Sequence, residues 1–364
     1  MAPAYVLVEA GKLDTFVAAI FRAAGCDGGE AGRISSHLLG ANLAGHDSHG
    51  VARVPRYVEW LEAGYVLKGK QAEIVTDGGA FALLDGGFGF GQTVAPQAVE
   101  LGVSRAQQHG IAVVGLRNAG HIGRVGEYAE TAIRAGLISV HFVNVAGSVL
   151  VAPFGGTERR FSTAPFSVGV PLPGRPLVLD FATSLVAEGK VLVASNGGKP
   201  LPHDALVEPD GSLSADPHTL YGEYPTVGPR NPANGKGAIR AFGEHKGSGL
   251  AFMCELLGGA LTGTGATSGG RRFANGMLAF YVDPKVVDTS HVFDAEVSRY
   301  VDFIRATRPV AGVDQVLIPG DPERKTRADR TRNGIPLPDD TWAAIVNTAR
   351  EVGVSELSIQ SATA

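Results

Sequence analysis

The chain has 364 residues, enough for two or more domains with a large buried core. Its 32 basic and 36 acidic residues give a formal net charge of −4, which argues against a general nucleic-acid-binding protein. Cys26 and Cys254 lie far apart in the sequence, so neither a disulfide framework nor a cysteine-rich zinc site is expected. The sequence contains no apolar run of membrane-spanning length and no signal-peptide pattern, so we expect a cytoplasmic protein.

The first 65 residues or so have the pattern of a helical segment. Apolar residues recur at helical spacing over 13–24, 30–44 and 51–62. The third helix is preceded by the sequence GHDSHG at 45–50, and Arg53 follows shortly after it. A helix N-terminus with an arginine beside it suits a carboxylate, because free N–H groups and the guanidinium both favour an anion. The alternative is an ordinary N-cap followed by solvated arginines.

The middle of the chain predicts strands alternating with helices. We expect strands and helices in turn over the ranges 72–84, 92–109, 111–116, 126–135 and 137–145. The segment NAGHIGRVGEY (118–128) joins a strand to a helix, but its glycines are not spaced as GxGxxG, and the next strand lacks an acid to hold a ribose. A Rossmann domain is therefore not expected. His121 lies at a helix N-terminus, which keeps an imidazole neutral near pH 7, although it could simply cap the turn.

Two further motifs carry charged groups. The apolar strand PLVLDFATS (176–184) contains one acid, Asp180, which either caps the following helix or holds a histidine. Lys246 precedes Gly-Ser-Gly at the start of a helix, where it suits a phosphate or pyrophosphate; a solvated lysine is the alternative. We expect the remaining segments to be a long surface excursion at 197–234, a strand at 277–282, a helix at 294–307, a strand with a tight turn at 316–322 and a helix at 341–352.

Five motifs in order resemble the type 2 malate/L-lactate dehydrogenase family: GHDSHGVARVPRY, NAGHIGRVGEYA, PLVLDFATS, HKGSG and IPGDP. The resemblance implies interconversion of a small 2-hydroxy acid and its 2-keto acid with NAD or NADP. It also implies an α/β fold with a non-Rossmann, three-layer α/β/α cofactor domain around a mixed sheet, an N-terminal helical segment, and a homodimer. The matching division of the chain is a helical segment at 1–70, a substrate and dimerisation domain at 71–120 and 275–364, and a cofactor domain at 121–274.

The resemblance also implies roles for individual residues. His49 matches the catalytic histidine, with Ser48 beside it, and Arg53 matches the arginine that holds the substrate carboxylate. His121 matches a second active-site histidine, which also contacts substrate and cofactor and is the proton acceptor in some members. We expect Asp180 to fix the tautomer of His49. The implied cofactor contacts are His121, Asn144, Leu179, Asp180, Phe181, His245, Lys246, Gly320, Asp321 and Pro322.

Other functions remain as alternatives. An NAD(P)H-dependent reductase of a cyclic 2-imino acid or a diketo sugar acid would use the same motifs. A metal-dependent hydrolase or lyase would need ligands from His46, Asp47, His49, His121 and Asp180, but these lack the spacing of a zinc motif, and we expect no metal. A ligand-binding protein without turnover would not require two histidines beside an arginine. Where the family usually reads GTNP, this chain has Ser162-Thr163-Ala164-Pro165, so an amide side chain is missing at Ala164.

Overall fold

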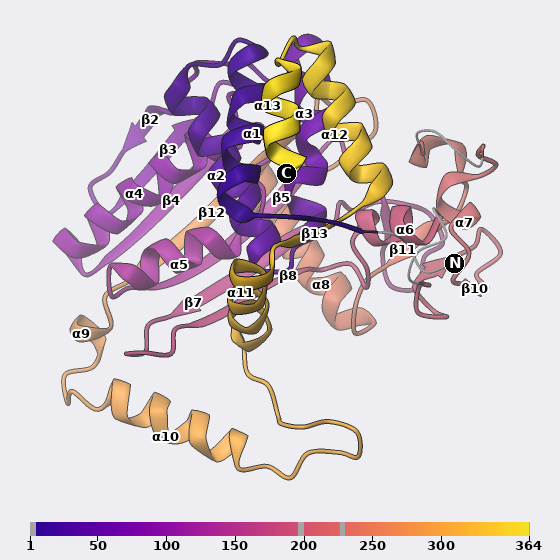
Figure 1. The fold of residues 1–364 in the computed structure, drawn as a ribbon. Helices are drawn as coiled ribbons and strands as arrows, with labels where there is room; N and C mark the ends of the chain where they lie inside the picture. Colours follow the sequence, from indigo (N-terminus) through magenta and orange to yellow (C-terminus); the bar gives the residue numbers. More distant parts are fainter. Residues whose placement is uncertain (1–4, 196–199, 226–229, 364) are drawn as a thin grey trace.

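The computed structural model describes residues 5–195, 200–225 and 230–363 (Figure 1). Within these residues the centre of the fold is a seven-stranded sheet in the order β2-β3-β4-β12-β5-β7-β8. β3 and β4 pair in parallel, and the other neighbouring strands pair antiparallel. The sheet is therefore mixed, as predicted. Its strands are β2 Glu73–Asp77, β3 Phe81–Asp85, β4 Ile111–Ala119, β5 Ile138–Ala146, β7 Pro165–Val170, β8 Leu177–Ala182 and β12 Ala274–Val282.

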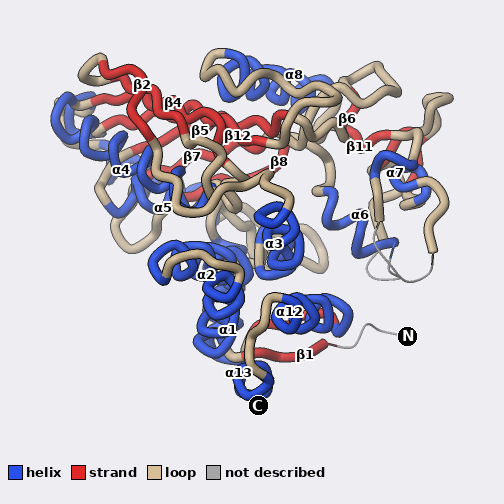
Figure 2. Tube along the Cα trace, turned by 90° about the horizontal axis from the view of Figure 1, so that it is seen from above, coloured by secondary structure: helices blue, strands red, loops and turns tan. Residues whose placement is uncertain are grey.

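Helices cover both faces of this sheet. Figure 2 shows α8 (His245–Cys254) on one face and α4 (Gly91–His109) and α5 (Gly126–Arg134) on the other. A π-helical turn, Glu255–Ala260, continues α8 across β5 and β12. Small apolar side chains of α4, such as Ala98, pack on buried strand residues, such as Val114. Because these side chains are small, the helix lies close against the sheet. The predicted three-layer α/β/α architecture is confirmed.

The N-terminal helical segment is completed by the C-terminal end of the chain. A common core holds Phe21, Ile34 and Tyr57 from the first segment with Trp342 and Ile345 from the last. The pairing of the two chain ends in a small antiparallel sheet was not predicted, because each strand has only four residues. The elements of this layer are β1 Tyr5–Val8, α1 Ala10–Ala23, α2 Gly28–Leu43, α3 Val54–Glu62, β13 Ile335–Pro338, α12 Asp339–Glu351 and α13 Glu356–Thr363.

The predicted surface excursion at 197–234 is wrong for the part that the structure describes. Residues 200–225 contribute to a second, four-stranded sheet with its own core, in which Leu206, Leu220 and Tyr221 are buried. Arg159 fixes the surrounding loops, since its guanidinium donates to four backbone carbonyl groups. The apolar runs here are too short, and too mixed with Pro and Gly, to show a period. The elements are β6 Val151–Ala152, α6 Glu188–Ser195, β9 Leu206–Val207, β10 Leu213–Ser214, α7 His218–Tyr221 and β11 Ala238–Arg240.

The predicted strand at the start of 316–322 is also wrong, whereas the predicted tight turn is present at Pro319 and Gly320. Residues 316–320 form a loop, and α11 (Asp321–Asn333) begins directly after it. The sequence of α11, DPERKTRADRTRN, has no apolar stripe from which a helix could be predicted. α9 (Pro284–Val287) and α10 (Phe293–Arg305) precede this loop, and α10 projects from the body of the molecule (Figure 1). Among the described residues, no helix has both the length and the apolar character needed to cross a membrane.

Candidate active site

The GHDSHG sequence folds as two 3-10 turns, Asp47–His49 and Val51–Arg53, which lead into α3. The Asp47 carboxylate accepts a hydrogen bond from Asn42 at 2.6 Å and pairs with Arg330 at 2.5 Å. The other side-chain atom of that amide, Asn42 Oδ1, accepts from the backbone of Val51 at 2.8 Å. One buried asparagine therefore links both turns to α2, and His49 and Arg53 are held in a fixed relationship.

His49 and His121 meet face to face. Their ring centroids are 5.6 Å apart and the planes differ by 6°. The Ser48 hydroxyl lies 3.2 Å from His49 Nδ1, and the Tyr57 hydroxyl lies 2.6 Å from His121 Nδ1. Arg53 donates through Nε to the Ser48 carbonyl at 2.6 Å. The structure thus brings together four residues predicted from the sequence, namely Ser48, His49, Arg53 and His121, and adds Tyr57, which the sequence analysis did not single out.

The electrostatics of the pair favour two neutral rings. Both residues are partly exposed, but burial, followed by the nearby Arg53 charge, lowers the pKa of His49 to about 3. The same two causes hold the pKa of His121 well below its usual value, with a further contribution from His49. Neutral imidazoles can stack without charge repulsion, and either can accept a proton.

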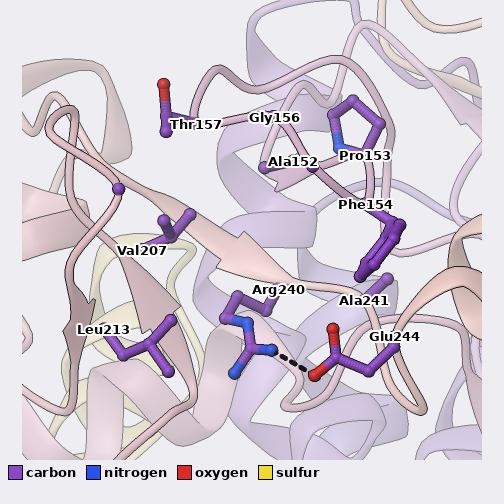
Figure 3. A pocket seen from close by; sticks show the side chains of 12 residues that line it. Ala152, Pro153, Phe154, Gly156, Thr157, Val207, Leu213, Arg240, Ala241 and Glu244 are labelled. Carbon is purple, nitrogen blue, oxygen red and sulfur yellow. Dashed lines mark hydrogen bonds and ion pairs between the residues drawn. The ribbon is translucent and has the colours of Figure 1, made fainter.

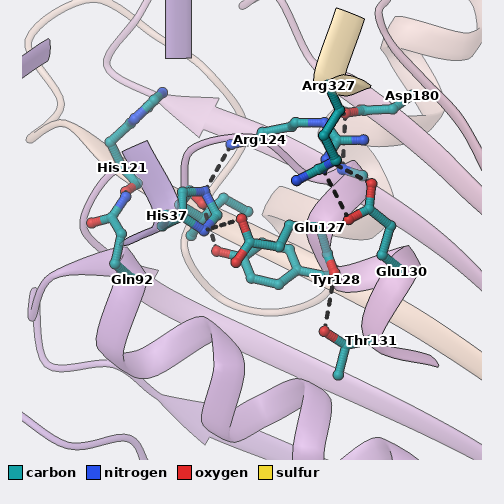
Figure 4. Close-up of polar contacts among 12 residues, drawn as sticks. His37, Gln92, His121, Arg124, Glu127, Tyr128, Glu130, Thr131, Asp180 and Arg327 are labelled. Atoms are coloured by element: carbon teal, nitrogen blue, oxygen red, sulfur yellow. Dashed lines mark hydrogen bonds and ion pairs between the residues drawn. The ribbon is translucent and has the colours of Figure 1, made fainter. Parts of the chain in front are cut away.

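The segment from His121 to Gly126 owes its shape to side chains of other elements (Figure 4). Its backbone groups do not form strand or helix hydrogen bonds with one another, so side chains of other elements satisfy them. Gly123 has a φ of +73° and passes so close to His37 that a Cβ atom there would lie 2.2 Å from the imidazole. The contacts are Gln92 Nε2 to His121 O at 3.0 Å, Ile122 N to Asn275 Oδ1 at 3.0 Å, Arg124 N to His37 Nε2 at 3.0 Å, and Gly126 N to Asp180 Oδ2 at 2.8 Å.

A buried charged network continues behind this segment. His37 is 3% exposed, and its Nδ1 lies 3.0 Å from Glu127. The side chain of Arg124 is 1% exposed and lies 2.8 Å from Glu130 and 3.7 Å from Asp180. The network ties α2, α5 and β8 to the segment that carries His121. Sequence reasoning could not find it, because a single histidine on a helix and a glutamate in a first turn are both ordinary.

The prediction that Asp180 fixes the tautomer of His49 is wrong. The Asp180 carboxylate accepts from the Gly126 backbone and faces Arg124, whereas His49 Nδ1 faces Ser48. Burial raises the pKa of Asp180, and the charges of His46 and Arg124 partly oppose that rise. Asp180 therefore anchors the start of α5, and it supports the His121 segment instead of His49.

The side chain of Asn144, a predicted cofactor contact, is turned into the fold. Asn144 is fully buried, and its amide is used internally. It donates to Glu255 at 3.1 Å and to the Gly265 carbonyl at 2.9 Å, and it accepts from the Gly276 backbone at 3.1 Å. These bonds join β5, β12 and the π-helical turn, so the side chain has no free group to offer a ligand.

The other predicted cofactor segments border one another. The end of β8 lies beside the start of α8, since Phe242 N donates to Thr183 O at 3.0 Å and the rings of Phe181 and Phe242 are 5.2 Å apart. The start of α11 lies beside the start of β8, where Arg324 donates to the Pro176 carbonyl at 2.6 Å. Within α11, the Asp321 carboxylate is occupied by Arg305 and Arg324. Gly320 and Pro322 lie on either side of it at the helix start, and Leu179 is partly exposed on β8.

The start of α8 has groups that fit an anionic ligand. His245 and Lys246 are exposed in its first turn, next to free helix N–H groups. Ser184 Oγ, close by, is buried and has no hydrogen-bond partner among the described residues. An ammonium group, helix N–H groups and an unpaired hydroxyl together suit the phosphates of a dinucleotide.

Two hollows lie near α8. One of about 230 Å³ lies between β6, β11 and the β9–β10 hairpin (Figure 3), and Phe154 and Glu244 are among its lining residues. A second, of about 390 Å³, also contains Phe154 and includes His245 and Ser248. Of the described residues that line them, none is a predicted catalytic residue. The second hollow adjoins the predicted phosphate-binding groups.

The set of ligands required by the metal-dependent alternative is dispersed. His46 pairs with Glu323 at 3.2 Å, Asp47 pairs with Arg330, and Asp180 faces Arg124. In the part of the chain that the structure describes, no three His, Cys, Asp or Glu side chains come together as metal ligands.

Residues 8–346 match the family model described as malate/L-lactate dehydrogenase, so the chain belongs to this family and is an oxidoreductase that acts on CH–OH donors. It is 38% identical over 360 residues to hydroxycarboxylate dehydrogenase B of Escherichia coli strain K12, covering 97% of this chain and 96% of that protein. The structure of malate dehydrogenase from Pyrococcus horikoshii OT3 is similar with a TM-score of 0.84 and 27% identity over 96% of this chain and 97% of that one. The structure of delta1-piperideine-2-carboxylate reductase from Pseudomonas syringae is also similar, with a TM-score of 0.79 and 28% identity. The match covers 94% of this chain and 99% of that one.

Proposed function

We propose that this protein transfers a hydride between a small 2-hydroxy acid and NAD or NADP, with the 2-keto acid as the oxidised product. The observation that carries the proposal is the stacked pair His49 and His121 within the field of Arg53. A guanidinium can hold the carboxylate of a 2-hydroxy acid while an adjacent neutral imidazole accepts the hydroxyl proton.

Arg53 is suited to hold the substrate carboxylate. Its Nε–H is used on the Ser48 carbonyl, which fixes the plane of the guanidinium relative to His49. Its two Nη groups have no hydrogen-bond partner in the described part of the chain, and a planar pair of donors matches a carboxylate in bidentate fashion. A carboxylate held there would place the neighbouring hydroxyl carbon near the two histidines.

His49 is the proposed proton acceptor in the oxidation direction. The proton of the substrate hydroxyl moves to the free nitrogen of His49, and the hydrogen on the same carbon leaves as a hydride. The Ser48 hydroxyl, 3.2 Å from His49 Nδ1, orients the ring through the nitrogen that does not face the substrate. In the reverse direction the His49 imidazolium returns the proton to the carbonyl oxygen.

The nicotinamide cofactor, when bound, supplies the carbon that accepts or donates the hydride. Lys246 and the start of α8 would hold its pyrophosphate, and the end of β8 and the start of α11 would border it. The exposed first turn of α8 and the unpaired hydroxyl of Ser184 support this placement.

A second candidate substrate class is a cyclic 2-imino acid. The His121 ring lies against an aromatic group formed by Tyr57, Trp60 and Phe273, with centroids between 5.8 and 6.5 Å from it. Such a wall suits a ring-shaped substrate, and the solved reductase from Pseudomonas syringae has the same fold.

We also propose that the protein is a homodimer. α10 carries exposed Tyr300 and Phe303, and the loop after it carries exposed Val310 and Leu317. Apolar side chains on a projecting arm are typical of surfaces that a partner covers. Sedimentation equilibrium of the intact protein tests this, and a single monomeric species at micromolar concentration would contradict it.

The test of the proposed function is a panel of 2-keto acids and cyclic 2-imino acids, each assayed with NADH and NADPH at the nicotinamide absorbance. We expect turnover with at least one 2-keto acid and loss of that turnover in His49→Ala. Turnover confined to the imino acids would favour the second candidate, and no turnover with any member would contradict both.

A further inference from the structure

The hydroxyl of Tyr57 lies between Gln92 and His121, and its hydrogen bonds decide which nitrogen of His121 carries a hydrogen. Gln92 Nε2 is 3.0 Å from the His121 carbonyl oxygen and 3.1 Å from Tyr57 Oη. A carbonyl oxygen can only accept a hydrogen bond, so the amide group that faces it must be the NH₂. Turning the amide round would set two acceptors against each other. Gln92 therefore donates to both His121 O and Tyr57 Oη.

The direction of the next hydrogen bond follows from this one. Tyr57 Oη already accepts from Gln92, and it lies 2.6 Å from His121 Nδ1. Its own hydrogen needs an acceptor, because the side chain is only 2% exposed. Within the described residues, His121 Nδ1 is the acceptor in reach. Burial also raises the pKa of the Tyr57 phenol, which keeps the hydrogen in place.

The arrangement is held rigidly from the α4 side. Gly91 precedes Gln92 and lies so close to the His121 segment that a Cβ atom there would be 2.4 Å from the His121 carbonyl oxygen. Gln92 itself is 1% exposed, and Tyr57 packs edge-on against the imidazole with the ring planes at 66°. The three groups therefore keep one geometry.

We propose that Gln92 and Tyr57 are positioning residues that hold His121 as the neutral tautomer with its hydrogen on Nε2. The use of that hydrogen rests on the proposed function: Nε2–H donates to the substrate oxygen. During oxidation the O–H bond breaks toward His49, the C–H bond breaks as the hydride leaves for the cofactor, and the carbonyl bond forms. His121 keeps its proton throughout and stabilises the negative charge that develops on the oxygen.

The tautomer can be measured without any assay of turnover. In ¹⁵N-histidine-labelled protein, we expect His121 to show an unprotonated Nδ1 and a protonated Nε2, with its signals assigned by their absence in His121→Gln. Tyr57→Phe should convert this signature into a mixture of tautomers. Tyr281→Phe is the matched control, because it removes another buried tyrosine hydroxyl, one with no hydrogen-bond partner among the described residues. A protonated Nδ1 in the wild-type protein, or an unchanged signature in Tyr57→Phe, would overturn the proposal.

Kinetics test the use of the hydrogen separately. We expect Tyr57→Phe to lower kcat by about 10- to 100-fold, by analogy with partners that orient metal-binding histidines, with little change in KM for the acid. Gln92→Met should lower kcat in the same direction, and it serves as the second variant if Tyr57→Phe does not fold. An unchanged kcat in both variants would overturn the role of Nε2–H. Absence of turnover in the wild-type protein would instead contradict the proposed function and leave the tautomer assignment standing.

Discussion

The imidazole rings of His49 and His121 lie almost parallel, 5.6 Å apart, although one follows α2 and the other follows β4. Burial and Arg53 keep both rings neutral by lowering both pKa values. A substrate carboxylate bound to Arg53 would offset part of that positive charge. Anion binding and proton binding at the histidines are therefore linked, and the pKa of His49 should rise when the substrate binds.

The first prediction concerns Arg53. Arg53→Ala should raise KM for the acid, with a loss on the order of 2–4 kcal/mol in transition-state binding, because the carboxylate loses a bidentate partner. Steady-state kinetics against the acid measure it. Arg56→Ala is the control, since Arg56 is exposed and, among the described residues, pairs with Glu59 on the helix surface. Equal effects in the two variants would mean that Arg53 is an ordinary surface charge.

Much of the fold could be predicted because apolar periodicity is a local property. α1, α2, α4 and α10 begin and end within a few residues of the predicted ranges. α11 could not be predicted, since its contacts with the rest of the molecule include ion pairs between Glu323 and His46 and between Arg330 and Asp47. Those partners lie far away in the sequence, and a charged helix without an apolar stripe resembles a solvated loop.

The second prediction concerns Lys246. Lys246→Ala should weaken binding of the reduced cofactor by roughly 10- to 100-fold, which corresponds to about 1.5–3 kcal/mol for a hydrogen bond to a charged group. The loss should shrink at high salt, because screening already weakens an exposed charge pair. Fluorescence titration of the reduced cofactor at two salt concentrations measures both effects. Lys285→Ala, which removes an exposed lysine on α9, should bind like the wild type.

The third prediction concerns Gly123. Gly123→Ala forces a side chain into a left-handed conformation, at about 1–2 kcal/mol, and into contact with His37. Gly136→Ala has nearly the same φ, +77° against +73°, but no atom within 4 Å of its Cβ. Gly123→Ala should therefore lower the free energy of unfolding by a further 1–3 kcal/mol or so, and reduce kcat as the His121 segment shifts. Urea denaturation and steady-state kinetics measure both quantities in the two variants. Equal free energies of unfolding would show that the His121 segment can move to accommodate a methyl group at position 123.

The partners of the site residues were the least predictable part of the site. The family resemblance implied that His49, His121 and Arg53 belong to one site, and the structure places the two histidine rings together. Asp180 was assigned to the wrong partner, since its strand position gives no direction in space. Its hydrogen-bond donor is the backbone N–H of Gly126, and backbone groups leave no trace in a sequence motif. The same reason hides Gln92, whose clearest contact is a carbonyl oxygen.

The fourth prediction concerns the proton. If His49 is the acceptor, kcat for oxidation should rise with pH through the His49 pKa of the substrate complex, since only the neutral ring accepts a proton. kcat for reduction should fall through the same value, since only the imidazolium donates. In the free enzyme the pKa is about 3, so kcat/KM for oxidation should show no His49 ionisation near pH 7. His49→Asn should lose about 10²–10⁴-fold in kcat and flatten both pH profiles, with cofactor affinity nearly intact.

The matching variant His121→Asn distinguishes the two histidines. It should lose activity but keep the slopes of both pH profiles, because in the proposed mechanism His121 never changes its protonation. If kcat of His49→Asn still depends on pH while kcat of His121→Asn does not, then His121 is the proton acceptor and His49 is not.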